Sequence, residues 1–137
     1  MYEELTAFLP ALQNADSYGE LVIDKINDGT PEHPIQFPWM NYSDAVSDFR
    51  RAVYSFVDEH EEMDLRSYQE ILERNGIRWS QNDMSRADVS KLDGQTVMAL
   101  ILGAIRADRF CDGALEEFLT EGQIQKWVRR LEEIDSK

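Results

Sequence analysis

The strongest constraint on the fold is an apolar run from Val97 to Ile105. Its aliphatic side chains fall on nearly every side of a helix, so a helix here has to be buried all round. The run is nine residues long, well short of the roughly 18 that a membrane span needs. We therefore predict a buried helix over residues 91–109, at the centre of a helical domain.

Apolar residues recur at helical spacing elsewhere in the chain. They predict helices over residues 2–14, from a cap at Ser43 to residue 57, from residue 65 to a stop at Asn75-Gly76, and over residues 112–121 and 123–135. Pro10 predicts a kink or an early stop near Leu9 in the first of these. Together with the central helix they predict a mainly α fold, a compact irregular or orthogonal bundle of about six helices.

The segment before the central helix, residues 77–92, is expected to be a connector. It contains two Ser-x-x-Asp patterns, Ser85/Asp88 and Ser90/Asp93, which resemble capping boxes with Asp in place of Glu. The second pattern predicts that Ser90 caps the central helix. Within that helix, Ala99, Gly103 and Ala107 form a line of small residues where a second helix can approach closely.

Residues 16–42 form an insert of different character. Three prolines crowd it, and Asn27-Asp-Gly-Thr30 is a turn signal. The alternation of Ile35, Phe37 and Trp39 on one side of that turn, and of Leu21 and Ile23 on the other, predicts either a short β-hairpin or a proline-rich loop. Its aromatic residues Phe37, Trp39 and Tyr42 are expected either to cover the helical core as a lid or to form a recognition surface.

Charge and cysteine content restrict the partners and the compartment. The chain has 137 residues and a net charge of −13, which fits one domain over residues 1–137. Residues 1–70 contain 15 acidic and 4 basic side chains, so direct binding to nucleic acid is not expected. A single cysteine excludes an internal disulfide, and the N-terminus lacks the basic start of a secretory signal. We expect a cytoplasmic protein without membrane association.

Several titratable side chains gather in the joint after the apolar run, Arg106-Ala-Asp-Arg-Phe-Cys-Asp112. A functional interpretation places Arg106, Asp108, Arg109, Cys111 and Asp112 around a pocket in which the arginines bind an anion. A structural interpretation is favoured over it. There the arginines face the negative end of the central helix, Asp112 caps the next helix and Cys111 is a small buried hydrophobe. Trp39 is the further candidate for partner binding.

No cofactor or metal site is predicted. His33, His60 and Cys111 are far apart in sequence and lack ligand spacing, and the chain has no phosphate-binding glycine loop or nucleophile elbow. Neither histidine is placed by sequence to act as a base for Cys111. Enzymatic activity therefore stays open but is not the favoured interpretation.

Several stretches resemble a known family. They are Ala104–Leu115, Gly122, Ile124–Trp127, Leu131–Asp135, Asp83-Met84, Ala87–Asp93 and Gln36–Trp39. The chain resembles, over most of its length, an uncharacterised family of small bacterial and archaeal proteins, a domain of unknown function. The resemblance implies a prokaryotic cytoplasmic source and a standalone domain, and it implies no chemistry.

We therefore predict a non-catalytic protein-binding or accessory module that acts through a protein partner or through self-association. Two alternatives remain. The acidic half of the chain suggests an antagonist of a basic or nucleic-acid-binding partner. The Arg106–Asp112 joint suggests a small-ligand sensor or an enzyme.

Overall fold

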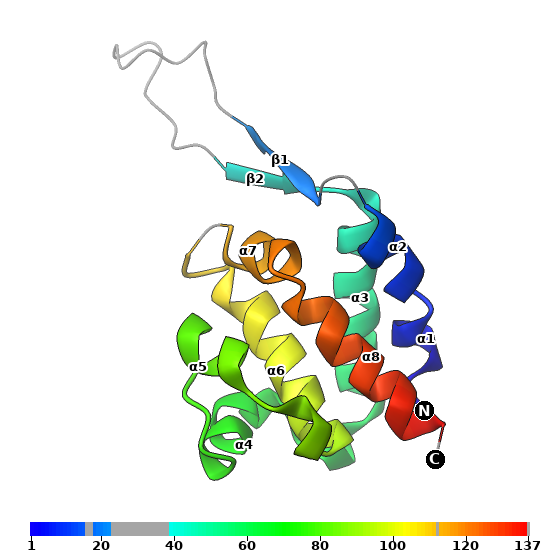
Figure 1. The fold of residues 1–137 in the computed structure, drawn as a ribbon, viewed down its shortest axis with the longest axis vertical. Helices are drawn as coiled ribbons and strands as arrows, with labels where there is room; N and C mark the ends of the chain where they lie inside the picture. The colour runs from blue at the N-terminus through cyan, green and yellow to red at the C-terminus, as the bar shows by residue number, and fades with distance from the viewer. Residues whose placement is uncertain (16–17, 23–38, 112, 137) are drawn as a thin grey trace.

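The computed structural model describes residues 1–15, 18–22, 39–111 and 113–136. Over these residues the fold is mainly α (Figure 1), as predicted. None of the helices in the described ranges is long and apolar enough to cross a membrane. The predicted turn at 27–30, the strand positions Ile35 and Phe37, and Asp112 lie outside the described residues.

The predicted central helix is present as α6, Gly94–Ala107. Every residue from Val97 to Ile105 is buried, with none more than 3% exposed where an exposure is given. The helix begins later than predicted, because its cap is Asp93 and not Ser90. The Asp93 Oδ1 accepts hydrogen bonds from the Thr96 N–H at 2.9 Å and from the Thr96 hydroxyl at 2.7 Å. The first of these is the hydrogen bond that an N-cap residue typically forms.

The other long helices surround α6 (Figure 1). Helices α4 (Tyr68–Arg74), α7 (Ala114–Thr120) and α8 (Gln123–Asp135) contact it directly. Helix α3 (Asp44–Glu59) begins at Ser43, whose hydroxyl accepts the Val46 N–H as predicted. Short 3₁₀ turns, η1 (Glu61–Met63) and η2 (Leu65–Ser67), join α3 to α4.

The first helix is divided, as Pro10 predicts. Helix α1 spans Glu3–Thr6 and α2 spans Leu9–Asn14, with Pro10 in the first turn of α2, where its missing N–H costs least. Both pack against α8 and α3. The start of the chain is also tied to the end of α8, since the Tyr2 N–H donates to Asp135 at 2.9 Å.

The connector before α6 is more structured than predicted. It contains α5 (Gln81–Arg86), capped by the Ser80 hydroxyl, and the turn η3 (Val89–Lys91). The predicted Ser85/Asp88 capping box is wrong: Ser85 lies inside α5, and the Asp88 carboxylate accepts the Ser90 N–H at the start of η3.

The line of small residues along α6 is used as predicted at Gly103. A Cβ added there would lie 3.2 Å from the Met84 Cε and 3.4 Å from the Trp79 Cδ1. The absence of a side chain therefore lets α5 and Trp79 approach α6 closely. The Trp79 Nε1–H also donates to the Gly103 carbonyl at 2.9 Å.

The insert contains a short antiparallel ladder. Strand β1 (Gly19–Val22) pairs with β2 (Trp39–Tyr42), with Gly19 opposite Tyr42 and Val22 opposite Trp39. The sequence alternation predicted a strand from Ile35 to Trp39. In the structure β2 starts at Trp39 and continues to Tyr42, directly before α3. A Cβ at Gly19 would lie 2.6 Å from the Asn41 carbonyl oxygen, which explains a glycine at the base of the ladder. The ladder projects from the end of the bundle near α2 and α7 (Figure 1).

Candidate functional site

The turn between α6 and α7 is organised by the carboxylate of Asp108. Its Oδ1 accepts the backbone N–H of Gly113 at 3.0 Å and that of Leu115 at 3.2 Å. The same oxygen accepts the Tyr42 hydroxyl at 2.6 Å, and that hydroxyl accepts the Glu116 N–H at 3.1 Å. Asp108 therefore caps the start of α7 and ties this corner to β2.

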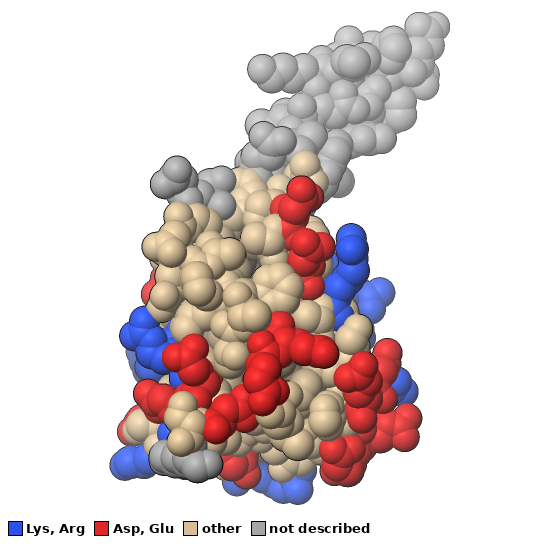
Figure 2. Space-filling model, turned by 90° about the vertical axis from the view of Figure 1, so that its right-hand side faces the viewer, with Lys and Arg blue, Asp and Glu red and all other residues tan. Residues whose placement is uncertain are grey.

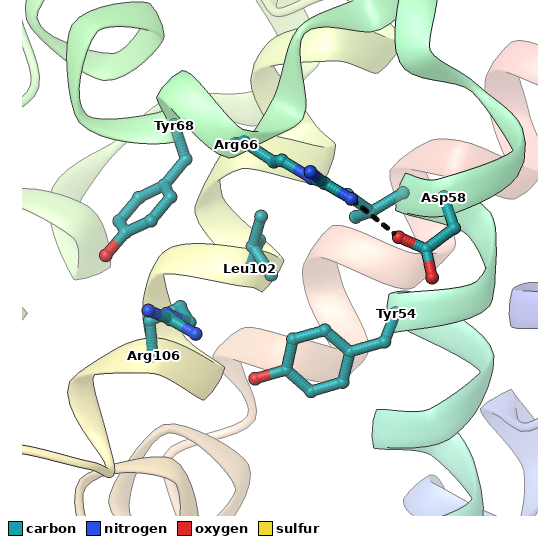
Figure 3. A pocket seen from close by; sticks show the side chains of 7 residues that line it. Tyr54, Asp58, Arg66, Tyr68, Leu102 and Arg106 are labelled. Carbon is teal, nitrogen blue, oxygen red and sulfur yellow. Dashed lines mark hydrogen bonds and ion pairs between the residues drawn. The ribbon is translucent and has the colours of Figure 1, made fainter.

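Arg106 faces a pocket of about 320 Å³ between α3, the η2–α4 segment and α6. We call it the Arg106 cavity, and its lining residues are Tyr54, Val57, Asp58, Arg66, Tyr68, Leu102 and Arg106. The hydroxyls of Tyr54 and Tyr68 lie on either side of the Arg106 guanidinium (Figure 3). They raise the pKa of Arg106, with Tyr54 having the largest effect. The guanidinium is charged at every physiological pH with or without this shift.

A second arginine, Arg66, lies at the far end of the Arg106 cavity and, unlike Arg106, has a carboxylate partner. Arg66 forms an exposed ion pair with Asp58 at 3.0 Å, which Figure 3 shows on the side away from Arg106. No described carboxylate lies within ion-pair distance of Arg106. The two arginines therefore differ, because one is neutralised within the chain and the other is not.

A second hollow, of about 240 Å³, lies between α5, the end of α6 and α7. We call it the Phe110 groove, and its lining residues are Trp79, Ser80, Gln81, Met84, Ala107, Phe110, Cys111, Ala114, Glu117 and Phe118. Phe110 is 76% exposed. Its ring meets Trp79 edge to face, with the centroids 5.6 Å apart. The groove is thus largely apolar, with an exposed aromatic ring at its edge.

The structure separates the residues of the predicted joint. Arg106 lines one hollow, Cys111 lines the other, and Asp108 caps α7 between them. Arg109 is exposed. Asp112 lies outside the described residues, and Trp39 is described through its backbone pairing in β2. The interpretation of Cys111 as a buried hydrophobe is wrong, since it is an exposed free thiol. A binding role for these residues stays a prediction.

Of the residues that line the Arg106 cavity, Arg106 alone was among the sequence candidates, and Tyr54 and Tyr68 are the polar residues beside it that were missed. The two tyrosines belong to other helices, at the edges of apolar faces, and only the packing of α3 and α4 against α6 brings them to Arg106. A tyrosine at the border of an apolar helical face is a weak signal, because its ring often packs while its hydroxyl reaches solvent.

Ionisable groups elsewhere form no metal site in the described ranges, where no three His, Cys, Asp or Glu side chains come together. The His60 Nδ1 lies 3.0 Å from a Glu62 carboxylate oxygen, and its ring packs on Phe56. On the face shown in Figure 2, acidic side chains lie in several groups, with basic side chains mainly toward the margins. That the chain does not bind nucleic acid directly remains a prediction. The acidic-antagonist role remains a prediction.

Comparison with known proteins assigns the family. The whole chain, residues 1–137, matches a family of unknown function (DUF6508). The chain belongs to this family. This confirms the resemblance seen in the sequence. No curated protein and no solved structure matches the chain. Because the family has no described activity, the function has to be argued from the two hollows beside the α6–α7 corner.

Proposed function

We propose that this chain is a non-catalytic protein-binding module that acts through the Phe110 groove, and that the partner is a second copy of the chain. The observation that carries the proposal is the exposure of Phe110 at the edge of an apolar groove. In the described part of the chain, Met1 is the other exposed large hydrophobic residue, and it lies at the terminus. Burying a phenylalanine side chain contributes about 1.5–3 kcal/mol.

The groove and the exposed ring lie side by side on one surface, which suits a two-fold contact. In such a contact the same patch is used twice, so the Phe110 ring of each copy can enter the groove of the other. The charges are also complementary. Exposed Arg109 precedes Phe110 and exposed Glu117 lines the groove, and neither forms an ion pair within the described residues. Arg109 of one copy can then pair with Glu117 of the other.

The oligomeric state tests this proposal. We expect sedimentation velocity to show a concentration-dependent dimer, and Phe110→Ser to raise its dissociation constant at least about tenfold, as loss of a central aromatic anchor does. Arg109→Glu and Glu117→Arg should each weaken the dimer, and the double variant should recover much of the loss. A monomer at every concentration up to about 100 µM, well above typical values for specific dimers, would contradict the proposal. So would a dimer that Phe110→Ser leaves unchanged.

A further inference from the structure

The Arg106 cavity contains hydrogen-bond donors that lack an acceptor. The Tyr68 hydroxyl accepts the Gln69 Nε2–H at 3.4 Å, so its own proton remains to be donated. The Tyr54 hydroxyl faces Arg106 and donates a hydrogen bond to no described residue, and no described carboxylate forms an ion pair with Arg106. Two hydroxyls and a guanidinium thus converge on one space with no negative charge between them (Figure 3).

The excess of hydrogen-bond donors around Arg106 contrasts with the rest of the chain, which has an excess of carboxylates. The chain carries a net charge of −13, so carboxylates are abundant, and Arg66 at the other end of the same cavity has one in Asp58. An arginine in the last turn of a helix stabilises the negative end of the helix dipole. That role does not explain why the Arg106 guanidinium lies between two tyrosine hydroxyls (Figure 3).

We propose that the Arg106 cavity binds a small organic oxyanion, a carboxylate or a phosphate monoester carried on a short apolar body. The planar guanidinium donates two parallel hydrogen bonds to one oxyanion, which is the geometry arginine forms best. The Tyr54 and Tyr68 hydroxyls each donate one more. Because the tyrosine oxygens face the guanidinium, which raises the pKa of Arg106, their protons are left for the ligand.

The size and walls of the cavity define the rest of the ligand. A volume of about 320 Å³ lies at the lower end of the roughly 300–1,000 Å³ typical of small-molecule sites. Buried Leu102 and Val57 and the tyrosine rings form apolar walls. A ligand with a single charged group and a body the size of one aromatic ring therefore fits better than a polyanion.

An NMR titration of the full chain with benzoate, phenyl phosphate and the neutral isostere benzamide tests the proposal. We expect benzoate or phenyl phosphate to shift the backbone amides of residues 53–58 and 102–107, with a dissociation constant of about a millimolar, as for other fragments. The anion that binds more tightly identifies the head group. Benzamide is expected to bind at least about tenfold more weakly, because it lacks the charge.

Variants separate this site from general charge attraction. Arg106→Gln is expected to weaken anion binding at least about tenfold, and Tyr54→Phe, which keeps the ring, about three- to tenfold. Arg129→Gln removes the same charge from an exposed position on α8, outside the cavity, and should leave anion binding unchanged. The proposal is overturned if neither anion shifts these amides at about 10 mM. It is also overturned if benzamide binds equally well, or if Arg129→Gln weakens binding as much as Arg106→Gln does.

Discussion

Leu100→Ala is expected to lower the free energy of unfolding by about 3–5 kcal/mol, the range measured for leucines buried in tightly packed cores. Leu100 is 0% exposed and lies in the middle of α6, with α4, α7 and α8 packed against that helix. These neighbours cannot close the space left by the missing atoms without disturbing several contacts at once. Urea denaturation should show a lower midpoint with an unchanged m-value.

Leu92→Ala is the matched control. Leu92 is half-buried and precedes the cap of α6, so the same chemical change should cost less than half as much. Equal losses at the two positions would mean that α6 is not the tightly packed centre of the fold.

The second large effect is expected at Asp108. Asp108→Ala removes the acceptor for the Gly113 and Leu115 N–H groups and for the Tyr42 hydroxyl. A lost helix cap and a lost charged hydrogen bond together should cost about 2–4 kcal/mol of unfolding free energy. Thermal and urea unfolding measure the loss. Asp108→Asn retains one acceptor oxygen and should cost clearly less.

A double-mutant cycle tests whether Asp108 and Tyr42 act together. Tyr42→Phe removes the hydroxyl that donates to Asp108 and keeps the ring. The two substitutions should couple by at least about 1 kcal/mol, as residues in one hydrogen-bond network do. Additive losses would show that the ladder is not tied to the α6–α7 corner through this contact.

The helical core could be predicted because its signals are local. Residues Val97–Ile105 are apolar on every side of the helix, so the helix had to be buried. The cap at Ser43 and the break at Pro10 depend only on residues nearby in sequence. The cap of α6 was misplaced by three residues, from Ser90 to Asp93. Both are good capping residues, and sequence spacing alone did not separate them.

The candidate sites could be predicted only in part because they depend on tertiary packing. The joint residues were found as a cluster in sequence, but the last turn of α6 directs Arg106 toward α3 and α4, whereas Phe110 and Cys111 face α5 and α7. Asp108 caps a helix that starts six residues later and accepts from Tyr42, 66 positions away. No local pattern encodes such a contact.

The central claim is that α6 is the buried central helix of the fold and that it positions the residues of both hollows. Native-state hydrogen exchange tests this claim most directly. The amides of residues 98–105 should exchange most slowly of all, and only through global unfolding, because every neighbour of this helix must leave before water reaches it. Exchange of these amides as fast as that of the short α1 helix would contradict a buried central helix, and with it the placement of Arg106 and Phe110.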